Sequence, residues 1–206
     1  MRDGFVSDVH GASESLERAI YVLQKAGYDR LWFLGDLVAD YPPDPAETWK
    51  CIKILKDASA TCILGNHDVV SYLMKDYPLK WFEEYMERAK PLVRENGSVY
   101  AHMGPGWPIT KDNIPSAKYI STKENAAKEF LKSEFDIAFL GHNHEPSIFG
   151  MDGTDVRFLE TGEMKLDRKN RWIVNVGAIA YSRDSTPEIS YALFDHITRK
   201  LTVFRG

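Results

Sequence analysis

The sequence predicts an α/β fold of packed layers, and three of its features lead to this prediction. Over the first two thirds of the chain, short apolar runs alternate with segments of helical periodicity, which is typical of βαβ units. After Gly141, strand-like runs joined by turn residues predominate, so the chain is expected to end as a β-meander. The 206 residues are 44% hydrophobic and 27% charged, as in a globular domain with its own core. We therefore expect one domain over residues 1–206, with one or two central sheets.

Two helices have clear boundaries in the sequence. The first is expected at Ser13–Ala26, where apolar residues recur on one face and Gly27 provides a stop. The second is expected to begin after Asp44, which can cap it. Pro45 suits its first turn and Glu47 would complete a capping box.

The strands are expected where apolar and β-branched residues cluster. The early ones are predicted at Phe5–Val6, Leu31–Leu34, Thr61–Leu64, Ser98–Ala101 and Ile137–Leu140. The later ones are predicted at Ile148–Phe149, Val156–Glu160, Trp172–Val176, Ser190–Phe194 and Leu201–Phe204. Asp152-Gly153 and Lys169-Asn170 are expected to form hairpin turns between later strands.

Two stretches carry less regular signals. Residues 72–90 are rich in large apolar side chains at helical spacing, which favours core packing, with a small cap or a dimer surface as the alternative. Residues 104–121 include three prolines and are expected to form a long loop, a candidate lid. Trp107 in this loop is a candidate for stacking on a nucleobase.

Charge and cysteine content exclude several classes of protein. With 26 Lys and Arg against 30 Asp and Glu, the net charge is −4, which disfavours binding to nucleic acid through bulk charge. Cys51 and Cys62 are too few for a disulfide framework. Since neither a signal peptide nor a long apolar segment is apparent, we expect a cytoplasmic protein without a membrane span.

Polar residues follow five of the predicted strands. The blocks contain Asp8 and His10, then Asp36, then Asn66-His67-Asp68, then His102, and finally His142 and His144. Ligands of open α/β sheets bind at strand ends, so these blocks are expected to converge on one crevice. Residues two apart in extended backbone point to the same side, so His142 and His144 can serve one site.

This series of DxH, GD, GNHD, H and GHxH resembles the calcineurin-like metallophosphoesterase superfamily, in particular its small bacterial and archaeal phosphodiesterase branch. The resemblance extends from Ser7 to about Asp195. It implies a four-layer α/β/β/α sandwich with mixed β-sheets around two metal ions. Two positions depart from the family pattern. Ala178 stands where the family commonly has a serine that touches substrate, and Asn143 replaces a common threonine, a change expected to matter little.

The resemblance also implies which residues hold the metals. Asp8, His10 and His144 would bind the first ion, Asn66, His102 and His142 the second, and Asp36 would bridge both. Four imidazoles favour transition metals over Mg²⁺ or Ca²⁺, so we expect two divalent ions, Mn²⁺ first and Fe, Zn, Co or Ni as alternatives.

The implied activity is hydrolysis of phosphodiesters or activated phosphate esters through attack by a hydroxide that bridges the metals. His67 would be the catalytic residue outside the ligand set, with Asp68 orienting it. Arg183 is a weaker candidate for a phosphate contact. The expected partner is a small phosphate ester, nucleotides included, and a homo-oligomer is left open.

Several alternatives stay open at this point. The chain could be a phosphomonoesterase, or belong to the diadenosine-polyphosphate and protein phosphatase branch of the superfamily. That branch usually shows GDxxDRG and GNHE, whereas the block beginning at Asp36 lacks Arg-Gly and the later block ends in Asp68. A non-catalytic binding scaffold and a nuclease are further alternatives. The dense basic cluster Lys165, Arg168, Lys169 and Arg171 is the feature that a nuclease would use.

Overall fold

The computed structural model describes residues 1–39, 42–77, 79–112, 114, 119–153, 155–159, 162–183 and 188–206, with 155–159 described by backbone alone. Within these ranges the chain forms two six-stranded sheets and five helices. The described helices are all too short or too polar to cross a membrane.

The first sheet has the strand order β3-β2-β1-β11-β12-β9. Its strands are β1 (Arg2–Val6), β2 (Arg30–Phe33), β3 (Thr61–Cys62), β9 (Glu163–Lys165), β11 (Ser190–Asp195) and β12 (Lys200–Arg205). The strands β1, β2 and β3 run parallel, whereas β11, β12 and β9 each pair antiparallel with the strand before them in this order.

The second sheet has the order β4-β5-β6-β10-β7-β8. Its strands are β4 (Val93–Glu95), β5 (Ser98–Ala101), β6 (Ile137–Leu140), β7 (Ser147–Asp152), β8 (Asp155–Leu159) and β10 (Arg171–Asn175). Here β5, β6 and β10 are parallel, and the outer pairs are antiparallel. Both sheets are therefore mixed, as the family resemblance implies.

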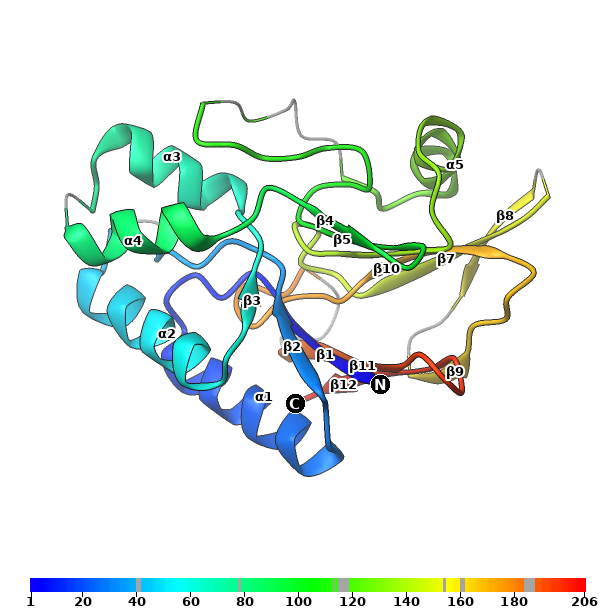
Figure 1. The fold of residues 1–206 in the computed structure, drawn as a ribbon, viewed down its shortest axis with the longest axis horizontal. Helices are drawn as coiled ribbons and strands as arrows, with labels where there is room; N and C mark the ends of the chain where they lie inside the picture. Colours follow the sequence, from blue (N-terminus) through cyan, green and yellow to red (C-terminus); the bar gives the residue numbers. More distant parts are fainter. Residues whose placement is uncertain are drawn as a thin grey trace.

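Helices cover the outer face of each sheet (Figure 1). The helices are α1 (Ser13–Ala26), α2 (Pro45–Asp57), α3 (Asn66–Met74), α4 (Lys80–Arg88) and α5 (Lys123–Lys132). The helix α1 packs on β1, β11 and α2, and α5 packs on β7 and β8. The layers thus follow the order α/β/β/α, which confirms the four-layer sandwich.

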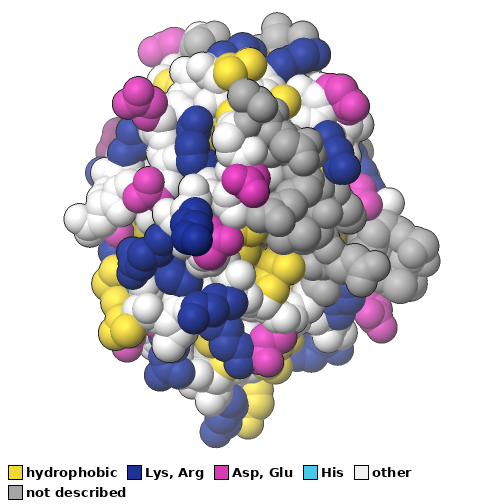
Figure 2. All heavy atoms as spheres, turned by 90° about the vertical axis from the view of Figure 1, so that its right-hand side faces the viewer, with side chains coloured by type: hydrophobic (Ala, Val, Ile, Leu, Met, Phe, Trp, Pro, Cys, Tyr) yellow, Lys and Arg dark blue, Asp and Glu magenta, His cyan; other side chains and the backbone are white. Residues whose placement is uncertain are grey.

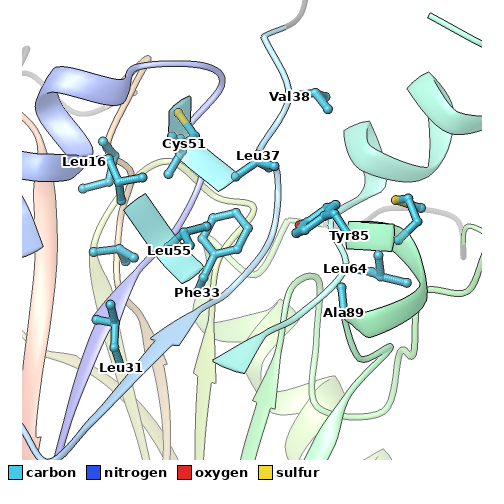
Figure 3. Close-up of a cluster of buried hydrophobic side chains, with 14 of the residues drawn as sticks. Leu16, Leu31, Phe33, Leu37, Val38, Cys51, Leu55, Leu64, Tyr85 and Ala89 are labelled. Carbon is cyan, nitrogen blue, oxygen red and sulfur yellow. The ribbon is translucent and has the colours of Figure 1, made fainter. Parts of the chain in front are cut away.

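Three apolar clusters fill the spaces between these layers. The first joins α1, α2 and α4 to the first sheet, and Figure 3 shows Leu16, Phe33 and Tyr85 within it. The second lies between the sheets, where Phe5 faces Tyr100 and Phe139 in stacked contacts. The third lies beneath α5. Because both faces of each sheet are covered, their central strands read as continuous apolar runs.

Local sequence signals account for the helix ends. The helix α1 occupies Ser13–Ala26 as predicted, and Gly27 ends it in the left-handed region at φ 81°. Asp44 caps α2 by accepting hydrogen bonds from the amides of Ala46 and Glu47, both at 3.0 Å. The Glu47 carboxylate accepts a bond from the Ser13 hydroxyl and so ties α2 to α1.

The predicted β-meander and one of the two hairpins are wrong. Asp152-Gly153 does join the antiparallel strands β7 and β8. Lys169-Asn170, however, lies between β9 and β10, which belong to different sheets. The Asp167 carboxylate accepts bonds from the amides of Lys169 and Asn170, which makes a tight turn without a hairpin. Leu166 is fully buried between the sheets and carries the chain from one sheet to the other.

Candidate metal centre

The predicted site residues follow strand ends in both sheets. Asp8 and His10 come after β1 and Asp36 after β2, while Asn66 begins α3 directly beyond β3. From the second sheet, His102 follows β5, and His142 and His144 follow β6. Because these five strands run parallel to their neighbours, their carboxyl ends deliver the side chains to one edge of the sandwich.

The backbone at these positions is bent. Five of the residues have left-handed φ values: Asp8 51°, His10 43°, Asp36 60°, His142 70° and His144 58°. Each such residue costs roughly 1–3 kcal/mol, and strain of this kind clusters at functional sites. The folded chain keeps these turns because they aim buried side chains inward.

The strand ends bring together two groups of candidate metal-ligand atoms, and Asp36 belongs to both groups. Asp8, His10, Asp36 and His144 have ligand atoms within 4.8 Å of one another, and so do Asp36, His102 and His142. The Asn66 side-chain oxygen lies 3.1 Å from His102 Nε2 and so joins the second group. Every one of these side chains except Asn66 is buried.

Backbone carbonyls fix which nitrogen of two histidines faces the centre. His144 Nδ1 lies 2.9 Å from the Tyr181 carbonyl, and His102 Nδ1 lies 2.6 Å from the Leu34 carbonyl. Since a carbonyl only accepts, each Nδ1 donates its proton, so Nε2 is the nitrogen that faces the centre. Those Nε2 atoms lie 3.2 Å from Asp8 Oδ1 and 3.1 Å from Asp36 Oδ2. A histidine whose Nδ1–H is bonded to a carbonyl is oriented to bind a metal ion through Nε2.

His142 gives a direct test of whether the residues fit a metal ion. Its Nε2 is buried and has no hydrogen-bond partner among the described residues. Burial, together with the nearby His102, lowers the pKa of His142 to about 4, so its imidazole is neutral. A neutral, buried imidazole whose unprotonated nitrogen lies beside a carboxylate is suited to bind a metal ion. The donor set therefore fits divalent metal ions.

The two aspartates are ionised in this setting. Burial would raise the pKa of Asp36, but the hydrogen bond from His102 and the charges of His102, His10 and His67 together outweigh it and hold that pKa well below its usual range. Burial would likewise raise the pKa of Asp8, but its hydrogen bond with His144 and the charges of His102 and His144 together bring it below the usual value. Both carboxylates are thus available as anionic ligands.

His67 lies beside the first group without belonging to either group found among the described residues. Its ring meets the His10 ring edge-on, with centroids 5.2 Å apart. Its backbone amide donates to Asp36 Oδ1 at 2.9 Å, at the N-terminus of α3. Gly65 precedes this helix, and a Cβ there would lie 2.1 Å from the Asp36 amide nitrogen, so only glycine permits this approach.

Asp68 is tied to the backbone around the site. It is fully buried, and its carboxylate accepts from the amides of Leu37 and Gly65 at 2.8 and 3.0 Å. The Tyr85 hydroxyl donates to it at 3.0 Å. Asp68 therefore joins the loop after β2 to the start of α3, which carries Asn66 and His67.

Two tyrosines at this site were not singled out from the sequence. Tyr119 stacks on the His142 ring with centroids 4.6 Å apart, and Tyr181 lies 5.4 Å from the His10 ring. Arg183, the weaker candidate for a phosphate contact, is exposed and lies over the Tyr119 ring at 4.8 Å. Neither tyrosine follows a strand with a recurring spacing, so nothing local distinguished them. The proline-rich loop around Tyr119 was the available signal.

Asn143, which stands where the family commonly has threonine, makes two hydrogen bonds that hold the site together. Its side chain donates to the Ile120 carbonyl at 2.7 Å and accepts from the Ile120 amide at 3.3 Å. It thereby clamps the segment next to Tyr119 onto the loop that carries His142 and His144.

The loop of residues 104–121 is described only in part, since 113 and 115–118 lie outside the described residues. Trp107 donates to Glu129 at 2.7 Å and receives Lys132 over its ring, so it packs on α5. Its proposed use in stacking on a nucleobase has no support from these contacts. Whether the loop acts as a lid stays a prediction.

Residues 72–90 largely pack inward. Phe82, Tyr85 and Met86 of α4 are buried in the first core cluster. A cavity of about 600 Å³ is lined by residues of both α2 and α4, including Trp49 and Trp81. None of the predicted site residues lines this cavity, so it is distinct from the candidate centre.

Within the basic cluster at residues 165–171, Arg171 is engaged by the protein itself, while Lys165, Arg168 and Lys169 are exposed. The Arg171 guanidinium donates to the carbonyls of Phe130, Ser133 and Phe135, which end α5 and lead into β6. Figure 2 shows Lys and Arg interspersed with Asp and Glu on one face of the molecule. A nuclease that tracks a phosphate backbone needs a stripe of one sign.

Comparison with known proteins agrees with this geometry. A family model described as "Calcineurin-like phosphoesterase superfamily domain" matches residues 1–199. The crystal structure of a metallophosphoesterase from Sphaerobacter thermophilus is similar over 100% of this chain and 88% of that one, with 25% identity and a TM-score of 0.80.

Two curated relatives extend the comparison. The protein MJ0912 of Methanocaldococcus jannaschii is 25% identical over 97% of this chain and 85% of its own length. A symmetrical bis(5'-nucleosyl)-tetraphosphatase of Photobacterium profundum is 43% identical over 68 residues, 31% of this chain. That match spans 23% of the tetraphosphatase, so this similarity is local.

Proposed function

Because the chain belongs to the calcineurin-like phosphoesterase superfamily, we propose that it is a metal-dependent hydrolase whose substrates are phosphodiesters or activated phosphate esters. The observation that carries the proposal is the position of Asp36, whose carboxylate lies within ligand distance of both groups of candidate ligands. One shared carboxylate between two sets of imidazoles is the arrangement a pair of metal ions requires.

The two ions would be held by the groups that the structure brings together. Asp8, His10 and His144 would bind one ion, Asn66, His102 and His142 the other, and Asp36 both. The mixture of imidazole and carboxylate ligands favours divalent transition metals, with Mn²⁺ as the first ion to try. When bound, two such ions polarise a phosphoryl group and lower the pKa of a water molecule.

The chain's own residues would handle the remaining chemistry. His67, half-buried next to His10, would donate a proton to the leaving oxygen and stabilise charge on the phosphoryl group. The N-terminus of α3 adds its positive dipole end there. Asp68 is a positioning residue in this proposal, since it is buried and holds the turn from which His67 projects.

A second candidate function is hydrolysis of dinucleoside polyphosphates. It is favoured by the local similarity to a bis(5'-nucleosyl)-tetraphosphatase. The same two-metal arrangement can act on phosphate anhydrides as well as esters, because both reactions transfer a phosphoryl group to water.

The test compares bis-p-nitrophenyl phosphate, p-nitrophenyl phosphate and diadenosine tetraphosphate as substrates, using metal-stripped protein reloaded with Mn²⁺. Preference for the diester supports the first candidate. Preference for the tetraphosphate supports the second. Preference for the monoester leaves only the activated-ester part of the first candidate, and turnover of none of the three contradicts both.

Variants assign the roles of the residues. Asp36→Ala should lose both bound metal and activity, while Asp57→Ala, which removes an exposed carboxylate from the end of α2, should change neither. His67→Ala should keep two metal ions per chain and lose rate. Activity of Asp36→Ala at full metal content, or loss of metal from His67→Ala, would show these assignments to be wrong.

A further inference from the structure

The His142 ring is held differently from the rings of two other candidate ligands. His102 and His144 each donate from Nδ1 to a backbone carbonyl, which fixes the direction of Nε2. The described part of the chain provides no hydrogen bond to either ring nitrogen of His142, whose Nε2 is buried. The torsion that turns an imidazole about its Cβ–Cγ bond has broad minima. Without another partner, the His142 ring would be free to turn and to carry Nε2 away from Asp36.

Tyr119 supplies the contact that restrains this ring. The Tyr119 and His142 rings are stacked, with an interplanar angle of 6° and centroids 4.6 Å apart. Turning either ring about its Cβ–Cγ bond would break this contact, because stacking requires the two planes to stay parallel. The His142 ring also meets the His102 ring edge-on, with centroids 5.2 Å apart.

Three asparagines hold the backbone that carries Tyr119. Asn125, in the first turn of α5, donates to the Tyr119 carbonyl at 2.8 Å. Asn143 donates to the carbonyl of the next residue at 2.7 Å and accepts from its amide at 3.3 Å. Asn175, at the end of β10, donates to the same carbonyl at 3.1 Å. Since Asn143 directly follows His142 in the chain, these bonds fix Tyr119 relative to the ring on which it stacks.

Core packing does not account for the position of the Tyr119 ring. The side chain is 40% exposed, and the contacts found for its ring among the described residues are with the His142 imidazole and the Arg183 guanidinium. A core tyrosine such as Tyr100 is instead fully buried among aromatic neighbours. The restrained backbone and the stacked ring thus bear on the candidate centre.

We propose that Tyr119 is a positioning residue for one of the two metal ions. Its ring takes the place of the hydrogen bond that His142 lacks and keeps Nε2 with the other ligand atoms of the second group, Asp36 and His102. The ion of the first group does not depend on Tyr119, because His144 is oriented by a backbone carbonyl. This inference rests on the proposed function to the extent that it requires two ions.

Calorimetric titration of metal-stripped protein with Mn²⁺ tests the inference. The wild-type protein should bind two ions per chain. Tyr119→Ala should bind one of them about tenfold more weakly and the other with unchanged affinity, as expected when a group that orients a single ligand is lost. Tyr119→Phe keeps the stacked ring and should bind both ions as the wild-type protein does.

A double substitution shows whether Tyr119 acts through His142. His142→Ala should weaken the same ion as Tyr119→Ala. In the His142→Ala background, Tyr119→Ala should change neither affinity further, because the ring that it orients is already gone. A merely structural role of Tyr119 would still reduce the affinity in that background.

A matched control is available on α1. Tyr21 is 58% exposed and receives Lys25 over its ring at 5.2 Å, the same type of pair as Tyr119 with Arg183. Tyr21→Ala should leave the affinities for both ions unchanged.

The possible results separate this inference from the proposed function. If the wild-type protein binds two ions and Tyr119→Ala either matches Tyr21→Ala or weakens both ions equally, the inference is overturned. A further loss caused by Tyr119→Ala in the His142→Ala background also overturns it. If the selective loss is found but none of the three test substrates is hydrolysed, the proposed function fails and the inference stands. A wild-type protein that binds fewer than two ions contradicts both.

Discussion

Replacement of Asp3 by asparagine tests the electrostatics that join the two sheets. The Asp3 side chain is fully buried at the start of β1. It accepts bonds from Arg30 Nε and Nη2 at 2.8 Å each, from the Tyr100 hydroxyl at 2.9 Å and from His196 Nε2 at 2.8 Å. Since Tyr100 belongs to the second sheet, the Asp3→Asn substitution should weaken the contact between sheets.

The magnitude follows from the pKa of Asp3. Burial would raise this pKa, but hydrogen bonds from His196 and Arg30 outweigh burial and lower it from 3.8 to about 2. A difference of this size corresponds to about 2.4 kcal/mol of folding free energy. Because the folded-state pKa is the lower one, the contribution is complete above the unfolded-state pKa and is lost as the pH falls from about 4 to 2.

The assay is urea unfolding of wild-type and Asp3→Asn protein at pH 7, 5 and 3. We expect the variant to be less stable by about 2 kcal/mol at pH 7 and 5, with roughly half of that difference remaining at pH 3. Asp29→Asn, which changes a carboxylate that is 55% exposed, should show little difference at any pH. A difference for Asp3→Asn that is the same at pH 5 and pH 3 would refute the reasoning.

Three further substitutions test other parts of the structure. Gly65→Ala should lower the metal content measured by mass spectrometry, because the added Cβ would lie 2.1 Å from Asp36 Oδ1, while the circular dichroism spectrum should not change. The control is Gly153→Ala, whose Cβ would have no atom within 4 Å and which should leave the metal content unchanged. Tyr85→Phe should reduce the free energy of unfolding by about 1.5–3 kcal/mol, since it removes a buried hydrogen bond to Asp68, and an unchanged urea midpoint would contradict this. Asp44→Ala should cost about 1 kcal/mol by removing the cap of α2, and equal stability in urea would show that the cap contributes nothing.

The sequence predicts most elements and the convergence of the site because both depend on local signals. The Gly27 stop is visible within one turn of α1, and the helix ends there. The ligand residues each follow an apolar run, and strand ends in a layered α/β fold meet at one edge.

What the sequence could not predict depends on contacts between distant segments. Lys169-Asn170 looks like any two-residue turn, and only the placement of Leu166 between the sheets shows that the chain crosses there. Asn143 meets Ile120, 23 residues earlier in the chain, and Tyr181 meets His10, so neither contact leaves a local pattern. The sequence suggests Asp68 as a partner for the adjacent His67. In the structure its carboxylate accepts hydrogen bonds from the Leu37 amide and the Tyr85 hydroxyl.

The position of β1 has a consequence for synthesis on the ribosome. This strand lies between β2, made soon after it, and β11 at Ser190–Asp195, made more than 150 residues later. Until β11 emerges, the strand that leads into Asp8 and His10 has an open edge, which is a surface on which other chains can aggregate. Chains that stall before Ser190 should therefore need protection by chaperones, and the capacity to bind metal should appear late in synthesis.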